Sequence, residues 1–279
     1  MRPRTSRAVA SVLAAVLAVA LLTACGDDTD DAQTLTFSIA EQGKGSRITG
    51  PQSAETGVAE ITLQNNNRKR EADLQLLRVE GNHSAEEVVE GLEKAMKGQP
   101  FPEWFFGGGG VGTTSAGQSG TVTQVFEPGT YYAIDTEGSL PSPKSLAAIE
   151  VSGEVSDEEV EADATVSAFE YGFKAEGLSS GKTEIAFENS GAQPHHLLIS
   201  EITGNKTADD VEQSFESDKG PPPLNEKNSQ STAVIEGGET QLVTLDLKPG
   251  RYALYCFITD RQGGKPHALK GMVDEVEVE

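Results

Sequence analysis

Four residues in the second half of the chain have side chains that together could bind a metal ion. They are His195, Cys256, His267 and Met272, and the last three follow the pattern Cys-x10-His-x4-Met. Two imidazoles and a thiolate form a trigonal copper site, and a distant thioether adds a weak axial bond. Because soft sulfur favours Cu(I) and imidazole accommodates Cu(II), this set indicates a copper site that can change oxidation state.

The segments around these residues resemble those of the cupredoxins, the plastocyanin and azurin family of blue copper proteins. As in that family, Pro194-His195 precedes an apolar run, and Cys256, His267 and Met272 surround the last loop. The resemblance covers residues 164–279. It implies a cupredoxin-like β-sandwich in this half of the chain.

The resemblance also implies a role for each residue of the motif. One type 1 copper ion would be held by His195, Cys256, His267 and Met272. His196 lies where the family usually has an asparagine that steadies the ligand loop. We therefore expect His196 to support the site rather than to bind the metal.

The segment between the cysteine and the second histidine of the motif is longer than in the small cupredoxins. Gly263 and Gly264 can supply a turn there, because glycine adopts backbone conformations closed to other residues. We expect Asp260 and Arg261 to pair within the segment and to stiffen it.

The chain contains an internal duplication. Three blocks recur in the same order, and two repeats of this length indicate two similar domains. The matching blocks are residues 61–65 and 185–189, residues 81–88 and 204–211, and residues 127–135 and 248–256.

Each unit shows the pattern of short strands with one helix. Residues 240–247 alternate between apolar and polar side chains, as a half-buried strand does. Further strands are expected at 251–257 and 272–278, and Ser84 and Thr207 each open a capping box. The predicted fold is all-β, with two cupredoxin-like Greek-key β-sandwich domains that each carry one inserted helix.

The first unit lacks the metal-binding residues. Ala72 lies near the counterpart of His195, and Asp135 replaces Cys256. We therefore expect this unit to bind no copper. The charged run 68–70 is predicted to be a solvated turn.

The glycine run 107–110 raises the alternative of a phosphate-binding loop. No Gly-Lys-Ser/Thr follows it, as such a loop requires. We expect a flexible surface loop instead.

The N-terminus has the order of a secretory signal, because an arginine-rich leader precedes the apolar run 8–24. The run ends in Leu22-Thr23-Ala24-Cys25, which resembles the lipobox of bacterial lipoproteins. We expect cleavage of residues 1–24 and attachment of lipid to Cys25, which would anchor the protein to the extracytoplasmic face of the cell membrane. The alternative is an ordinary secretory signal with an accidental cysteine.

The net charge indicates which partners to exclude. The formal net charge of −22 argues against nucleic acid as a partner.

The duplication and the acidic stretches predict the domain organisation. The expected organisation is an acidic tether at 25–33, a degenerate domain at 34–154, an acidic linker at 155–163 and a copper domain at 164–279.

The expected function is that of a membrane-anchored copper protein that carries electrons to or from a redox protein partner. No Ser-His-Asp arrangement and no second histidine-rich cluster accompanies the motif, so we expect no enzyme activity. Two alternatives stay open. One is a metal-free module that binds a protein or a cell-envelope component, and the other is a copper capture or delivery protein.

Overall fold

The computed structural model describes residues 32–43, 45–137, 141–217 and 220–279. The expected signal sequence and Cys25 lie outside these residues. Within the described ranges, no helix is long and apolar enough to cross a membrane.

The secondary structure is mostly β. In the first half the elements are β1 (Gln33–Gln42), β2 (Gly45–Thr49), β3 (Ser53–Glu55), β4 (Gly57–Asn65), β5 (Ala72–Val79), α1 (Ala85–Met96), β6 (Phe105–Thr114), β7 (Ser119–Phe126), β8 (Gly129–Ile134) and β9 (Ala147–Ser152). In the second half they are β10 (Ala164–Phe169), β11 (Gly172–Glu176), β12 (Gly181–Asn189), β13 (Leu198–Glu201), α2 (Ala208–Glu216), β14 (Gln230–Ser231), β15 (Thr240–Leu247), β16 (Gly250–Tyr255) and β17 (Val273–Val278). Short 3-10 helices lie at Pro143–Ser145, Glu226–Asn228 and His267–Lys270.

The two halves are sandwiches with the same strand arrangement. In the first, the run β2-β1-β4-β7 faces the sheet β3-β9-β8-β5-β6. In the second, the run β11-β10-β12-β15 faces the sheet β14-β13-β16-β17. Each has a parallel pair at the matching place, β1 with β4 and β10 with β12, and the first has a further parallel pair, β3 with β9. The predicted all-β fold with two cupredoxin-like sandwiches is confirmed.

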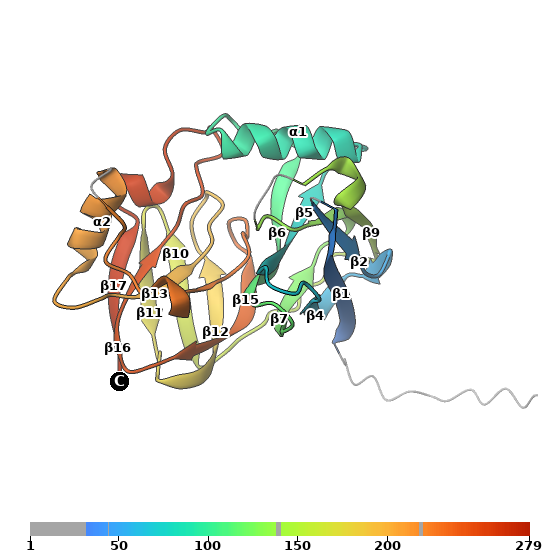
Figure 1. The fold of residues 1–279 in the computed structure, drawn as a ribbon. Helices are drawn as coiled ribbons and strands as arrows, with labels where there is room; N and C mark the ends of the chain where they lie inside the picture. The colour runs from blue at the N-terminus through green and yellow to red at the C-terminus, as the bar shows by residue number, and fades with distance from the viewer. Residues whose placement is uncertain (1–31, 44, 138–140, 218–219) are drawn as a thin grey trace, which may run out of the picture. The chain divides into compact units, whose positions relative to one another are not determined.

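One continuous sheet joins the sandwiches. Strand β15 of the second half pairs antiparallel with β7 of the first, with Val243 opposite Val122. The result is an eight-stranded sheet that passes from one half into the other (Figure 1). The sequence pattern did not predict this pairing, because alternation identifies a strand but not its partner.

The two helices begin where the capping boxes predict. The Ser84 hydroxyl accepts the N–H of Glu87, and the Thr207 hydroxyl accepts that of Asp210. Helix α1 buries Val88 against the ends of β5 and β6, and α2 buries Val211 in a separate cluster with residues of β16 and β17.

Strand β15 has the predicted alternation. Val243, Leu245 and Leu247 are buried, whereas Thr244 and Asp246 are exposed. The other two predicted strands are slightly shorter than expected, since β16 ends at Tyr255 and β17 begins at Val273.

The glycine run is not a flexible surface loop, so that expectation is wrong. Residues 107–110 lie in β6 and are buried. Gly110 has a φ of 121°, and a Cβ there would lie 2.0 Å from the carbonyl oxygen of Leu74. A Cβ on Gly112 would lie 1.8 Å from the carbonyl oxygen of Ser231 in the other half. These glycines let the two backbones approach closely.

The acidic segment between the halves contains no helix or strand from 155 to 163. One of its carboxylates still has a defined partner, because Glu158 accepts the backbone N–H of Val58 at 3.1 Å. The segment is thereby attached to the start of β4.

Candidate metal centre

The predicted metal-binding residues lie at the ends of strands in the second sandwich. Cys256 follows β16, and Met272 precedes β17. His195 forms a two-way backbone bridge with Ile235 just before β13. His267 opens the last 3-10 helix.

Backbone hydrogen bonds hold the end of the last loop next to Cys256. The N–H of His267 donates to the carbonyl of Ile258 at 2.8 Å, and that of Ala268 donates to the carbonyl of Cys256 at 2.7 Å. The length of the intervening segment therefore does not keep His267 from reaching the site.

Three donor atoms meet in the sandwich interior. Nδ1 of His267 lies 3.1 Å from Nδ1 of His195 and 3.6 Å from Sγ of Cys256. All three lie within 4.8 Å of one another, and all three side chains are fully buried. Donor atoms bound to one ion at about 2.0–2.3 Å lie roughly 3–4 Å apart, so this set fits a single metal ion.

Met272 is also fully buried, in the same core cluster as Cys256. Its N–H donates to the carbonyl of His267 at 3.0 Å, which keeps its backbone beside the histidine. With two imidazoles, one thiol and a nearby thioether, the cluster fits a type 1 copper site.

His196 supports the loop that carries the cysteine. Its Nε2 accepts the backbone N–H of Phe257 at 3.0 Å, directly after Cys256. Burial lowers the pKa of His196 to about 3, so the ring is neutral and Nε2 can accept this bond. His196 is not part of the cluster of donor atoms.

A carboxylate faces the outer nitrogen of His195. Oε1 of Glu170 lies 3.7 Å from Nε2 of His195, which is ion-pair distance rather than a hydrogen bond. The same oxygen accepts the N–H groups of Ala192 and Gln193 at 2.6 and 2.7 Å. Glu170 therefore holds the loop before His195 and favours a proton on Nε2, which leaves Nδ1 free for a metal.

A second carboxylate bonds to the other histidine. Oδ1 of Asp260 lies 3.1 Å from Nε2 of His267, and Asp260 also pairs with Lys270 and accepts the hydroxyl of Tyr171 at 2.9 Å. Such outer contacts fix the tautomer and the ring orientation of a metal-binding histidine.

The expected pair between Asp260 and Arg261 is wrong. Arg261 instead pairs with Glu236 at 3.0 Å. It also donates to the carbonyls of Pro102 and Phe105 in the first half. The two residues begin a turn closed by the hydrogen bond from the Gly263 N–H to the Asp260 carbonyl, and their side chains have different partners.

Burial sets the protonation of the donors before metal binds. Burial lowers the pKa of His267 to about 4 and also lowers the pKa of His195. Burial raises the pKa of the Cys256 thiol to about 12. The imidazoles are therefore neutral and ready to bind, whereas the thiol must lose a proton.

The first sandwich has an ion pair where the second has the cysteine. Asp135 occupies that place and pairs with Arg70 at 2.6 Å, while the Ser46 hydroxyl donates to the same carboxylate. Arg70 is thus part of a half-buried pair, and the expectation of a solvated turn is wrong for this residue. Among the described residues, the group His195, Cys256 and His267 is the only one that could hold a metal ion.

Sequence reasoning missed Glu170, Tyr171 and Lys270. The chain holds 44 acidic residues, so one more carboxylate gives no signal without its distance to a histidine. Only the fold brings these side chains beside the two histidines of the cluster or beside Asp260.

A protein-family comparison matches the second half of the chain. Residues 158–279 match the copper binding proteins of the plastocyanin/azurin family. A search of curated proteins finds no match.

Solved structures of copper proteins also match. Auracyanin from Roseiflexus castenholzii is 21% identical, over 44% of this chain and 100% of its own, with a TM-score of 0.31. Auracyanin A, a blue copper protein from Chloroflexus aurantiacus, is 15% identical over 43% and 99%, with a TM-score of 0.31. A copper nitrite reductase from Nitrosomonas europaea is 15% identical over 89% and 94%, with a TM-score of 0.26.

The family match covers every residue of the buried cluster. Residues 158–279 are therefore similar to the copper binding proteins of the plastocyanin/azurin family, and their buried cluster fits a single type 1 copper site.

Proposed function

We propose that the protein is a membrane-anchored, extracytoplasmic electron carrier with one type 1 copper ion in its second sandwich. The observation that carries this proposal is the buried group of His195, Cys256 and His267, with Met272 beside it. Copper bound there would supply one-electron redox chemistry.

The surroundings of the site suit electron transfer. The carboxylates of Glu170 and Asp260 hold the two imidazoles in orientation, so the protein changes little when the charge at the site changes. The donor side chains are closed off from solvent, whereas a catalytic metal site keeps an open position for substrate. This supports a carrier rather than an enzyme.

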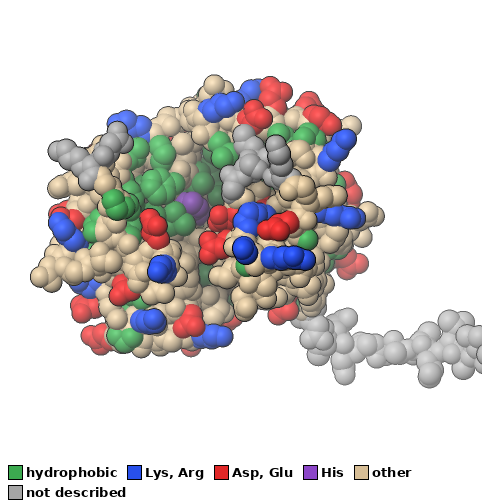
Figure 2. Space-filling view, viewed as in Figure 1, with side chains coloured by type: hydrophobic (Ala, Val, Ile, Leu, Met, Phe, Trp, Pro, Cys, Tyr) green, Lys and Arg blue, Asp and Glu red, His purple; other side chains and the backbone are tan. Residues whose placement is uncertain are grey.

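An aromatic surface beside the cysteine supports contact with a redox protein. Phe257, bonded directly to Cys256, is 39% exposed. Its ring packs on Phe215 at 4.9 Å and on Tyr255 at 5.7 Å. In the space-filling view, hydrophobic side chains gather around histidine atoms (Figure 2). Partly exposed aromatic side chains of this kind are enriched at protein interfaces.

The test of the site is the colour of the copper-loaded protein. One equivalent of Cu(II) added to the mature chain should give an intense visible thiolate-to-copper band. Ascorbate should remove the band and ferricyanide should restore it, with copper retained. Rapid loss of copper to a chelator would favour capture and delivery instead. A colourless protein with a freely reactive Cys256 would favour the metal-free binding module.

The anchor rests on the lipobox-like sequence that ends in Cys25. A lipid on this residue would keep the protein at the membrane surface. Cys25→Ala should move the protein to the soluble fraction or leave it unprocessed. Complete processing with unchanged membrane association would reject the lipoprotein assignment.

A further inference from the structure

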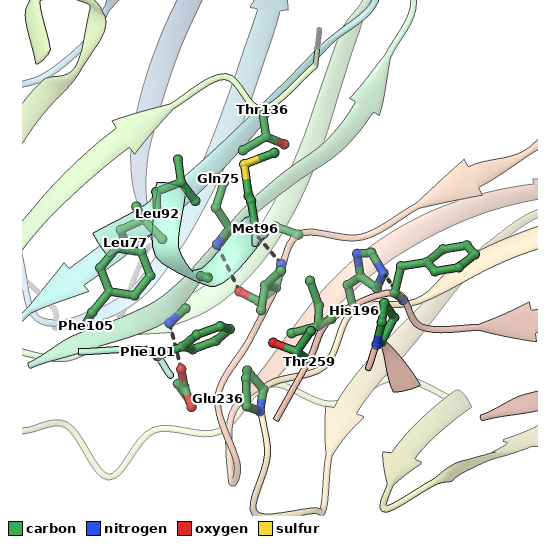
Figure 3. A pocket seen from close by; sticks show the side chains of 18 of the residues that line it. Gln75, Leu77, Leu92, Met96, Phe101, Phe105, Thr136, His196, Glu236 and Thr259 are labelled. Atoms are coloured by element: carbon green, nitrogen blue, oxygen red, sulfur yellow. Dashed lines mark hydrogen bonds between the residues drawn. The ribbon is translucent and has the colours of Figure 1, made fainter. Parts of the chain in front are cut away.

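A cavity of about 560 Å³ lies between the two sandwiches. Figure 3 shows its walls, with Gln75, Met96 and Phe101 from the first half opposite His196 and Thr259 from the second. Its volume lies within the range of sites for small organic molecules, which often form between domains. The larger apolar side chains of the lining include Leu77, Leu92, Met96, Phe101, Phe105 and Phe257.

One polar side chain in the lining lacks a partner. Thr259 is only 8% exposed, and its hydroxyl forms no hydrogen bond with any described residue. The hydroxyl is drawn on the side that faces Phe101 (Figure 3). A buried hydroxyl without a partner is destabilising, so a ligand group that bonds to it would bind favourably.

Two other polar side chains of the cavity, Gln75 and Glu236, already have partners. The Gln75 amide donates to the carbonyl of Val234 at 3.1 Å and accepts its N–H at 2.8 Å. Glu236 pairs with Arg261. The ligand therefore needs one hydrogen-bonding group directed at Thr259.

The cavity favours an uncharged ligand. Asp73 accepts both the N–H and the hydroxyl of Thr136, and burial raises the pKa of Asp73 to about 7. Lys97 pairs with Glu93 at 3.4 Å. A charged ligand would lose its hydration here and find no free partner of opposite charge in this wall.

The cavity wall continues into the copper site. His196 and Phe257 both line the cavity, and they are bonded to each other through Nε2 and the Phe257 N–H. Each is also the direct neighbour in sequence of a copper-binding residue, His195 or Cys256. A molecule bound against this wall would therefore shift His196 and Phe257, which are joined directly to the copper-binding residues His195 and Cys256.

We propose that the cavity binds a small uncharged phenol whose hydroxyl forms a hydrogen bond with the hydroxyl of Thr259. Occupancy of the cavity then alters the copper site through His196 and Phe257. Aromatic rings suit the aromatic lining, and the hydroxyl matches the buried, unpartnered hydroxyl of Thr259. The binding depends only on the cavity, whereas its effect on copper rests on the proposed function.

The binding test compares p-cresol with p-xylene on the copper-free full chain by calorimetry. The two probes have nearly the same shape, but only p-cresol has a hydroxyl. The wild type should bind p-cresol about tenfold more tightly, as expected for one buried hydrogen bond. Thr259→Val should bring the two affinities within about twofold while p-xylene still binds. Failure of the wild type to bind p-cresol, or an unchanged preference in Thr259→Val, would overturn the proposal.

A blocking variant tests the location. Ala95→Trp on α1 places a large ring in the cavity lining and should abolish p-cresol binding. Ala85→Trp, at the start of the same helix and outside the lining, is the matched control and should bind normally. Equal binding by both variants would place the site elsewhere.

The copper arm separates this proposal from the proposed function. In copper-loaded protein, p-cresol should shift the visible band, and the titration of this shift should give a dissociation constant close to the calorimetric one. The variant Ala95→Trp should show no shift. Binding without a shift would reject the link to copper. A protein that binds p-cresol but never turns blue would reject the carrier function and leave the cavity site established.

Discussion

The two sandwiches share one scaffold and differ at one end. In the second, the side-chain amide of Asn189 donates to the carbonyls of Gln193 and Ile235, and its oxygen accepts the N–H of Gly191. In the first, the amide of Asn65 donates to the carbonyls of Arg70 and Thr114, and its oxygen accepts the N–H of Asn67. The same loop is therefore fixed in the same way in both.

A second matched bond lies beside the metal-binding position. His196 accepts the N–H of Phe257 in the second sandwich, and Asp73 accepts the N–H of Thr136 in the first. The tyrosines after the Pro-Gly turns match as well, since the hydroxyls of Tyr252 and Tyr131 each donate to a carbonyl four residues earlier.

What differs is the group that fills the end of each sandwich. The second has the buried cluster with Cys256, and the first has Asp135 paired with Arg70. The loops, turns and strand order persist in the first sandwich although it lacks the cysteine and the histidines, so this arrangement does not depend on those side chains. The metal site is a set of side chains added to a framework that is already complete.

The largest effect is expected from removing the cysteine. Cys256→Ser should abolish the visible band, because the band arises from the copper–sulfur bond, and weaken copper binding by more than about 100-fold, since loss of outer partners alone costs roughly 10–100-fold. Metal analysis after dialysis measures this. The counterpart Asp135→Asn should retain one copper per chain. Copper loss in both variants would mean that the two ends do not differ as described.

The sequence predicted this contrast because ligand type and order are local properties of the chain. His195, Cys256, His267 and Met272 were predicted from their residue types, from their order and spacing, and from the resemblance to the cupredoxins. The donor atoms of the two histidines and the cysteine lie within 4.8 Å of one another. The capping residues of both helices were equally visible.

The sequence did not predict what depends on distant partners. Pairing of β15 with β7 and the contact of Arg261 with the first half join residues far apart in sequence. The buried glycines of β6 were predicted to form a loop. Glycine is needed there because the backbones of Leu74 and Ser231 lie too close for a Cβ atom, which the sequence does not reveal. Such features need coordinates, since no local pattern encodes them.

The second expected effect is a pH dependence confined to the copper-binding half. The raised pKa of Cys256, about 12, means that copper must displace one proton, whereas the histidines, with pKa values lowered by burial, displace none near neutral pH. Copper affinity should therefore rise about tenfold per pH unit between about pH 6 and pH 8. Competition titrations with a chelator of known pH dependence measure it. A slope near a hundredfold per unit would mean that a histidine is protonated as well.

A smaller effect is expected from breaking the ion pair of the first half. Asp135→Ala should lower the free energy of unfolding by about 2 kcal/mol, less than the roughly 3–5 kcal/mol of a fully buried pair, because the Arg70 side chain is 31% exposed. Urea unfolding measures the change, and the copper band should stay the same. Replacing both partners, with Arg70→Met and Asp135→Leu, should recover most of the loss. No recovery would mean that Ser46 rather than Arg70 is the partner that matters.

The smallest effect tests the bond that both halves share. His196→Asn should keep copper bound with an unshifted band, because an amide oxygen can also accept the N–H of Phe257. His196→Ala leaves that N–H without a partner and should weaken copper binding by about tenfold or less, in line with roughly 1 kcal/mol for one hydrogen bond. His195→Asn, which removes a donor atom of the cluster itself, is the control and should lose the band. If His196→Asn loses copper as fully as His195→Asn, then His196 binds the metal, and the matched bonds of the two sandwiches do not serve the same purpose.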